Sequence, residues 1–401
     1  MGEANRPAAR RSGRFLRWVA LAGVWLGLSI GLVELGLRAW QRIVPPPGGI
    51  WESSPTRHHA LVPDASIPHR SPEFDCRWHN NALGMRDRER SARKPPGTYR
   101  ILFLGDSMVQ GHGVALEDTI PTRLEALLAQ ASPGRPVEVL NAGVFAYSPM
   151  LEWLYLQEIA DTLQPDVVLL GFTLANDVGE DAFYEGQATP DASSHGVHFT
   201  TTRWPWERIT EILDAKSDGG TGPPPGPVQR LGEFLERHSR AFSAIHEATR
   251  SPESPAAYYA RREREFALVA AHRGDVSMDL GLVNYPVLTR EKRLQYWARS
   301  KHYLGEIEAL CRARGVPLVL VVFPPYERFD GTTSFDEPYQ ELDATGAALG
   351  VPVIQLLGTL SRSSYFPYDR HLRPEGTAAA AGAIARELVR LGLSGAVRAP
   401  G

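Results

Sequence analysis

A serine, a histidine and an aspartate in this sequence have the types and spacing needed for nucleophilic catalysis. Ser107 lies in the tripeptide Gly105-Asp106-Ser107, and His371 follows Asp369 after one intervening residue. A serine hydroxyl is a weak nucleophile until a neighbouring base accepts its proton, and His371 is the candidate base. Asp369 could hold the imidazole in the correct tautomer and stabilise the imidazolium that forms. The chemistry this predicts is acyl transfer through Ser107.

Such chemistry also needs hydrogen-bond donors aimed at the negative oxygen of a tetrahedral intermediate. The sequence offers three candidates for this oxyanion hole: the backbone N–H of Ser107, the backbone N–H of Gly143 and the side-chain amide of Asn176. A glycine at position 143 would let a backbone amide approach the substrate closely.

Short apolar runs that alternate with amphipathic stretches must position these residues. Strands are predicted at 100–104, 137–140, 166–172, 316–323 and 351–357, and helices at 117–130, 148–163, 291–313, 336–348 and 374–391. This alternation predicts an α/β fold, a doubly wound parallel sheet with helices on both faces. In such sheets sites form beyond the carboxyl ends of the strands, where Ser107, Gly143 and Asn176 all fall.

The ordered set resembles the SGNH, or GDSL-type, hydrolase family, because Ser107, Gly143, Asn176 and His371 match its four signature positions. The resemblance covers about residues 99–177 and 314–392. It implies a serine esterase with a flavodoxin-like three-layer sandwich, no metal and no cofactor. The stretch 80–86, Asn-Asn-Ala-Leu-Gly-Met-Arg, also resembles a lead-in common to membrane-anchored bacterial members.

The sequence departs from the family pattern at three places. Leu174 stands where the third motif usually has glycine, and the final motif is Asp-x-His rather than Asp-x-x-His. Residues 178–290 form a large insertion rich in Gly, Pro, Ser and charge, with helices expected near 228–248 and 255–272.

Arg370 and Arg373 flank His371. Solvated surface charge is the ordinary interpretation of both, and a bidentate contact with a sugar carboxylate is the alternative.

The first forty residues predict a membrane anchor. Five arginines precede a 20-residue apolar run at 18–37, which as a helix matches the thickness of a bilayer core. The excess of arginine before the run places the N-terminus in the cytoplasm and the rest of the chain outside. A cleaved signal peptide and a buried soluble helix are the alternatives. The expected location is the cell inner membrane, single-pass, with an extracytoplasmic catalytic domain, which would be periplasmic if the source is a Gram-negative bacterium.

The composition excludes several classes of protein. The chain has 401 residues, 43% of them hydrophobic, and 43 basic residues balance 46 acidic ones. It is therefore neither fully disordered nor a nucleic-acid binder that acts through bulk positive charge. A phosphate-binding loop is absent, because Gly105 to Gly113 lacks the required Gly-Lys-Ser/Thr. Cys76 and Cys311 are the only cysteines. One disulfide between them is possible, but two cysteines are too few for a cysteine-built zinc site.

These observations predict five regions: a basic cytoplasmic tail at 1–17, the anchor at 18–37, a linker and lead-in at 38–98, the hydrolase domain at 99–392, and a C-terminal tail at 393–401. Residues 51–98 are polar and without strong periodicity, so they are expected to be irregular. The predicted function is an anchored extracytoplasmic serine esterase that removes O-acetyl groups from a cell-surface or exported carbohydrate. The alternatives are an O-acyltransferase of exopolysaccharide that uses the same triad, a lipase or thioesterase, and a catalytically silent carbohydrate-binding envelope protein. Protein partners are not predicted.

Overall fold

The structure is a computed structural model. It describes residues 49–174, 176–191, 196–200, 254–271, 289–329 and 336–395, together with scattered residues between 17 and 36. The chain divides into two compact units, one of Met1–Pro47 with Gly219–Glu253 and one of Gly48–Asp218 with Ser254–Gly401. Every element named below belongs to the second unit.

A five-stranded parallel sheet forms the centre of this unit, as the alternating pattern predicts. Its strands lie in the order β11-β10-β7-β5-β6, which is 2-1-3-4-5 from the opposite edge when the five are counted along the chain. This is the flavodoxin-like order. The bounds are β5 Tyr99–Gly105, β6 Val137–Gly143, β7 Val167–Thr173, β10 Leu318–Phe323 and β11 Val353–Gln355.

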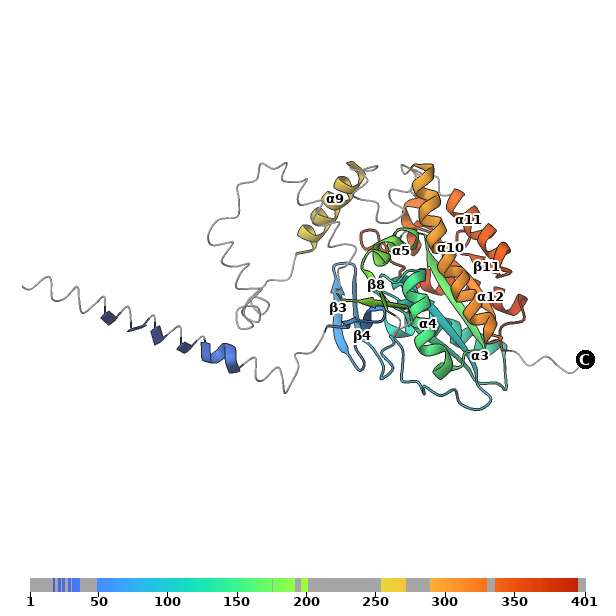
Figure 1. Ribbon diagram of the computed structural model, residues 1–401, viewed down its shortest axis with the longest axis horizontal. Coiled ribbons are helices and arrows are strands. Elements are labelled where there is room, and N and C mark those ends of the chain that lie inside the picture. The colour runs from blue at the N-terminus through green and yellow to red at the C-terminus, as the bar shows by residue number, and fades with distance from the viewer. Residues whose placement is uncertain are drawn as a thin grey trace, which may run out of the picture. The chain divides into compact units, whose positions relative to one another are not determined.

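Helices cover both faces of the sheet and produce three layers (Figure 1). On β5, Leu102 packs into the core formed with one pair of helices, and Phe103 packs into the core on the opposite face. All seven residues of β5 are buried, as expected for a strand covered on both sides. The helices are α4 Pro149–Leu163 and α10 Arg290–Ala313 on one face, and α3 Ile120–Ala131 and α12 Pro374–Arg390 on the other; α5 Asp177–Glu185 and α11 Asp336–Leu349 complete the set.

The expectation that residues 51–98 are irregular was wrong. This stretch contains two antiparallel hairpins, β1 Trp51–Ser54 with β2 His58–Leu61 and β3 Ser66–Ser71 with β4 Phe74–His79. Both belong to the same compact unit as the sheet. The strands are short, and the side chains of β3 alternate only between exposed and half-buried. The apolar/polar alternation that reveals a strand is therefore weak here.

The predicted insertion also contains regular structure. Helix α9, Pro255–Ala271, agrees with the helix expected at 255–272, and β8 Ala188–Asp191 pairs with β9 Gly196–Phe199 in a third hairpin. The helix expected at 228–248 lies outside the described residues.

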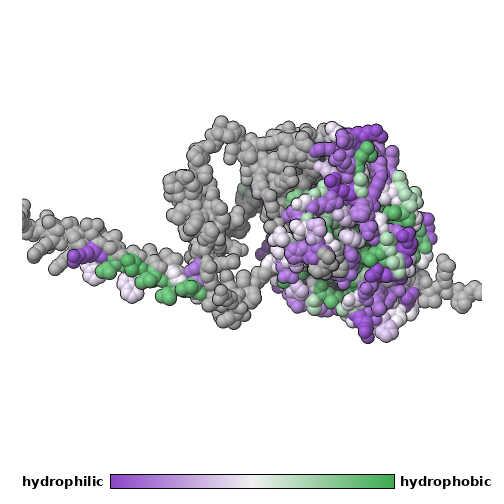
Figure 2. All heavy atoms as spheres, viewed as in Figure 1, coloured by the Kyte–Doolittle hydropathy of each residue, from purple (hydrophilic) through white to green (hydrophobic). Residues whose placement is uncertain are grey.

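The anchor predicted at 18–37 falls only partly within the described residues. Those residues are helical, and large apolar side chains among them are exposed, including Trp18, Trp25 and Leu32. Figure 2 shows hydrophobic residues at the surface of this segment. In the part of the chain that the structure describes, no helix reaches the length and apolarity required to cross a membrane. The anchor therefore stays a prediction.

The two cysteines are both free thiols. Cys76 lies on β4 and is half-buried, while Cys311 is buried on α10. Burial raises the pKa of both thiols. The structure thus holds no disulfide between them.

Candidate active site

Ser107, His371 and Asp369 form a continuous hydrogen-bonded relay. The Ser107 hydroxyl lies 2.8 Å from Nε2 of His371, and Nδ1 of the same ring lies 2.7 Å from Oδ1 of Asp369. Both distances fall within the range of ordinary hydrogen bonds. One imidazole tautomer, with its proton on Nδ1, satisfies both contacts. In that tautomer Nε2 can accept the serine proton.

The turn after β5 positions Ser107. Gly105 has a φ of 155°, and any side chain there would clash with Val109. Asp106 then caps the four-residue helix α2, Ser107–Gln110, by accepting the backbone N–H of Met108 at 2.9 Å. Ser107 is therefore the first residue of a short helix that begins where β5 ends.

A tight loop before α12 carries the other two members of the relay. Arg370, between them, adopts a left-handed φ of 75°, and its N–H donates to the carbonyl of Phe366 at 3.1 Å. The N–H of Phe366 in turn donates to the carbonyl of His371 at 2.8 Å. A non-glycine residue in this conformation is uncommon and marks a loop that its surroundings constrain.

Two distant segments hold this loop from outside. Glu73, in the turn between β3 and β4, accepts the backbone N–H of Tyr368 at 3.2 Å and that of Asp369 at 2.6 Å. Arg262 of α9 donates to the carbonyl of Tyr368 at 2.6 Å and 3.1 Å. The hairpin and the helix from the predicted insertion therefore both contact the loop that carries the relay.

His371 and Asp369 shift each other's pKa values in the directions that proton transfer needs. Burial alone would lower the pKa of His371, but the neighbouring Asp369 outweighs it and the pKa is raised. Burial also favours the neutral acid of Asp369, yet His371 and the hydrogen bonds from His112 and His371 hold the pKa of Asp369 well below its usual range. Asp369 is therefore a carboxylate at neutral pH, and it favours the imidazolium that proton transfer from serine would create.

The residues expected in the oxyanion hole are arranged differently from the prediction. Gly143 does not line the cavity beside Ser107, and its N–H donates to Oδ1 of Asn141 at 3.1 Å. Its lack of a side chain serves packing, because a Cβ at this position would clash with the backbone of Gln110 in α2. The predicted role of Gly143 as a donor to substrate therefore does not fit this arrangement.

Ala146 takes the place that sequence reasoning gave to Gly143. It lines the cavity beside Ser107, has a left-handed φ of 57°, and its N–H donates to no acceptor among the described residues. Alanine rarely adopts this conformation, so the sequence alone gives no sign of it. The Ser107 N–H likewise has no acceptor within the described part of the chain.

Asn176 does lie at the site, but its amide is engaged. Nδ2 lies 2.9 Å from Oε2 of Glu180 and 3.4 Å from Oδ2 of Asp106. These two acceptors fix the amide beside Ser107, within the wall of the same cavity. An amide held in this way would reach an oxyanion only by exchanging its longer contact, the one to Asp106.

The cavity above Ser107 has a volume of about 210 Å³. Apolar groups line part of it, among them Phe145, Pro325 and Met108, and Arg370 and Glu327 supply charged groups. The guanidinium of Arg370 lies 3.8 Å from the centre of the Tyr326 ring and also 3.8 Å from Glu327. Arg373 is not part of the wall; it precedes α12 and pairs with Glu375. Of the two arginines that flank His371, the structure brings only Arg370 to the site.

Buried carboxylates lie behind the nucleophile. Burial raises the pKa of Asp106 and, together with neighbouring carboxylates, raises the pKa values of Glu152, Asp177 and Glu180. Asp177 accepts the backbone N–H of Thr173 at the end of β7, and Asp181 accepts that of Met150 at the start of α4. These last two carboxylates fasten loops and helix starts around the site.

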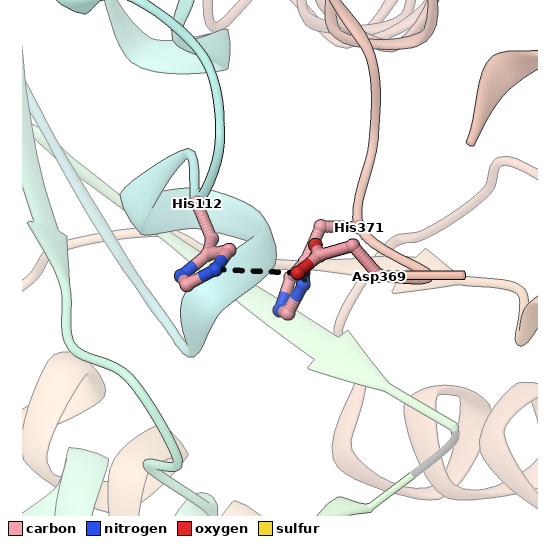
Figure 3. A group of neighbouring side chains, drawn as sticks. All are labelled: His112, Asp369 and His371. Atoms are coloured by element: carbon pink, nitrogen blue, oxygen red, sulfur yellow. Dashed lines mark hydrogen bonds and ion pairs between the residues drawn. The ribbon is translucent and has the colours of Figure 1, made fainter. Parts of the chain in front are cut away.

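His112, Asp369 and His371 bring enough nitrogen and oxygen atoms together to hold a metal ion by ligand type (Figure 3). Both ring nitrogens of His371 are already used, one by Ser107 and one by Asp369. The rings of His112 and His371 also lie against each other in a tilted arrangement, with centres 4.3 Å apart and planes inclined at 32°. A metal ion bound to His371 would have to replace a bond of the relay, so the donor set favours proton transfer.

Comparisons with known proteins give weak similarities. No protein-family model matches the chain, and no curated protein matches it. Among solved structures, a lipolytic protein of the G-D-S-L family from Desulfitobacterium hafniense is 11% identical with a TM-score of 0.33. The matched region covers 72% of this chain and 98% of that protein. The esterase EstA from a Pseudoalteromonas species has 9% identity and a TM-score of 0.38, with coverage of 73% and 97%. An acetyl-xylooligosaccharide esterase from Geobacillus has 11% identity and a TM-score of 0.38, with coverage of 75% and 96%. Similarities at this level do not establish a family or an activity.

Proposed function

We propose that this protein is a serine esterase that works through an acyl-enzyme on Ser107. The observation that carries the proposal is the relay from Ser107 through His371 to Asp369, with both bonds shorter than 3 Å, open to a cavity. These are the parts that turn a serine hydroxyl into a nucleophile.

In the acylation step, Oγ of Ser107 attacks the carbonyl carbon of an ester and its proton passes to Nε2 of His371. Asp369 stabilises the imidazolium that results. The negative oxygen of the tetrahedral intermediate accepts the N–H groups of Ser107 and Ala146, with Asn176 as a third donor once its contact with Asp106 exchanges. Collapse of the intermediate breaks the bond to the alcohol, which takes the proton from His371.

In the deacylation step, a water molecule enters the position that the alcohol has left. His371 accepts its proton as it attacks the acyl carbonyl, and the proton then returns to Oγ of Ser107 as the carboxylic acid departs. Atoms and charge balance without a cofactor. The raised pKa of His371 fits this role, because the ring must take up a proton in both steps.

We further propose an O-acetyl ester of a carbohydrate as the substrate, and an anchored extracytoplasmic location for the enzyme. The cavity of about 210 Å³ suits a small acyl group. Its charged rim, Arg370 and Glu327, offers both donors and acceptors to sugar hydroxyls. The location rests on the apolar run at 18–37, which follows five arginines.

The test measures ester hydrolysis by the full-length protein in detergent. p-Nitrophenyl acetate, p-nitrophenyl octanoate and an acetylated polysaccharide are compared, and a fluorophosphonate probe reports the reactivity of the serine. Ser107→Ala should lower kcat at least about 10³-fold and abolish labelling. Ser363→Ala, at an exposed serine of the same compact unit, is the matched control and should retain both.

The pattern of substrates decides the finer points. Release of acetate from the polysaccharide, faster than octanoate hydrolysis, supports the carbohydrate assignment. Preference for octanoate would point to a lipase, and acetyl transfer to a sugar acceptor without net hydrolysis would point to the acyltransferase. A folded protein that neither labels nor hydrolyses any ester would refute the proposed function.

A further inference from the structure

A second histidine contacts the carboxylate of the relay. Nε2 of His112 lies 3.5 Å from Oδ2 of Asp369, the oxygen that His371 does not use (Figure 3). The ring of His112 also lies against that of His371, with centres 4.3 Å apart. One residue therefore touches both the carboxylate and the base.

The local fold fixes the position of His112. It follows Gly111, which ends the nucleophile helix α2 in a left-handed conformation, and its own N–H donates to the carbonyl of Ser107 at 3.1 Å. Buried Arg86 donates to the carbonyls of Gln110, Gly111 and Val114 on either side. The backbone that carries His112 is thus tied to the nucleophile and to the segment before the sheet.

Aromatic rings enclose the remaining faces of the His112 side chain. The ring of His69 on β3 stands edge-on to it with centres 4.5 Å apart, and that of Phe74 on β4 does so at 5.6 Å. Phe145 lies on a further side, with ring centres 5.7 Å apart. The β3–β4 hairpin therefore limits the rotation of His112 and keeps its Nε2 directed at Asp369.

The protonation state of His112 follows from these neighbours. The groups facing it are His69, Asp369, His371 and Arg86. Burial, and then the positive charge of His371, lower the pKa of His112 despite the nearby carboxylate. A neutral ring carries one N–H, and Nδ1 is buried without a hydrogen-bond partner among the described residues. Placing the proton on Nε2 gives Oδ2 of Asp369 a donor. Nδ1 is then an acceptor, which costs less to leave unpaired in the interior than an N–H donor does.

We propose that His112 is a positioning residue of the catalytic relay, an inference that rests on the proposed esterase function. His371 contacts one oxygen of the Asp369 carboxylate and His112 contacts the other, and together these contacts restrict rotation of the carboxylate group. Oδ1 then stays directed at Nδ1 of His371 during both proton transfers. His112 acts through Asp369 and takes no proton from the substrate.

Two substitutions separate the donor from the ring. His112→Phe keeps an aromatic ring against His371 but removes the N–H, while His112→Gln keeps an amide N–H near the position of Nε2 and removes the ring. We expect kcat of the Phe variant to fall about tenfold, the lower end for a bond to a charged group because the contact is long. KM should stay within about twofold, and the Gln variant should recover kcat to within about threefold of the parent.

The measurements are kcat and KM with p-nitrophenyl acetate, the rate of labelling by the fluorophosphonate, and thermal unfolding of the full-length protein. A Phe variant with parental kcat and labelling rate would overturn the inference. Phe and Gln variants with equal losses would also overturn it, because packing alone would then account for the effect. If the parent protein itself neither labels nor hydrolyses esters, the proposed function fails, which is a different result from an active parent with an unaffected Phe variant.

Discussion

Replacing Glu73 by glutamine tests how far the catalytic loop depends on the β3–β4 hairpin. The Glu73 carboxylate accepts the backbone N–H groups of Tyr368 and Asp369, one on each oxygen. A glutamine keeps one oxygen and replaces the other by NH₂, which cannot accept. One of the two backbone donors therefore loses its partner, at a cost of about 1–2 kcal/mol for a half-buried group.

This cost should appear mainly in catalysis. The two amides belong to the loop that places Asp369 and His371, so a freed loop samples positions in which the relay is broken. If the transition state loses about 1.4 kcal/mol of stabilisation, kcat falls about tenfold. KM should change little, because Glu73 does not line the cavity.

The assay is the hydrolysis of p-nitrophenyl acetate by the Glu73→Gln variant, with urea unfolding measured in parallel. Glu263→Gln is the matched control: among the described residues that exposed carboxylate accepts only the Tyr368 hydroxyl, at 3.1 Å, and a glutamine can still accept it. The control should stay within about 0.5 kcal/mol of the parent in unfolding free energy and retain its kcat. A Glu73→Gln variant with the kcat of the control would refute the idea that this hairpin positions the loop.

Three further predictions follow from the same geometry. Asp369→Asn should lower kcat by about 10³–10⁴-fold, since it removes the charge that favours the His371 imidazolium, and the acid limb of the kcat/KM profile should move to lower pH; an unmoved limb would contradict the assigned partner. Gly143→Ala should destabilise the fold by about 1–3 kcal/mol in urea unfolding, because the new methyl group meets the backbone of Gln110; an unchanged midpoint would show that α2 can move. Burial raises the pKa of Asp181 to about 6 from 3.8, so its contribution to stability is complete below about pH 4 and about 3 kcal/mol is lost as pH rises through 6. Asp181→Asn should therefore flatten the decline in unfolding free energy between about pH 4 and 6.5, and an equal slope in both proteins would count against this pKa.

The sheet could be predicted because its strands are buried on both faces. Runs such as 100–104 and 166–172 are almost entirely apolar, and each is followed by a glycine or polar turn. All five predicted strands are present, and the helices that begin at Pro149 and Pro374 start within one residue of the predicted positions. The hairpins at 51–79 were missed because short two-stranded ribbons bury too little on either face to leave a clear period.

The relay could be predicted because serine, histidine and aspartate are the residue types of a candidate nucleophile, base and partner, and their positions follow predicted strands or precede a predicted helix. Ser107, Asp369 and His371 therefore emerge from the sequence and meet at one edge of the sheet. Glu73, His112 and Ala146 were not predicted. Their roles depend on a tertiary contact or on a single backbone dihedral, and neither leaves a pattern in the neighbouring residues.

The separation of Ser107 and His371 along the chain determines when the proposed relay can form. The two residues lie 264 positions apart, and the base follows β10 and β11 in the sequence. A chain that folds as it is synthesised can build β5, α2 and the two hairpins early, but it holds an inert serine until the loop before α12 has emerged. The proposed esterase activity would therefore be among the last properties this chain acquires, and an assay of hydrolysis would also report completion of the sheet.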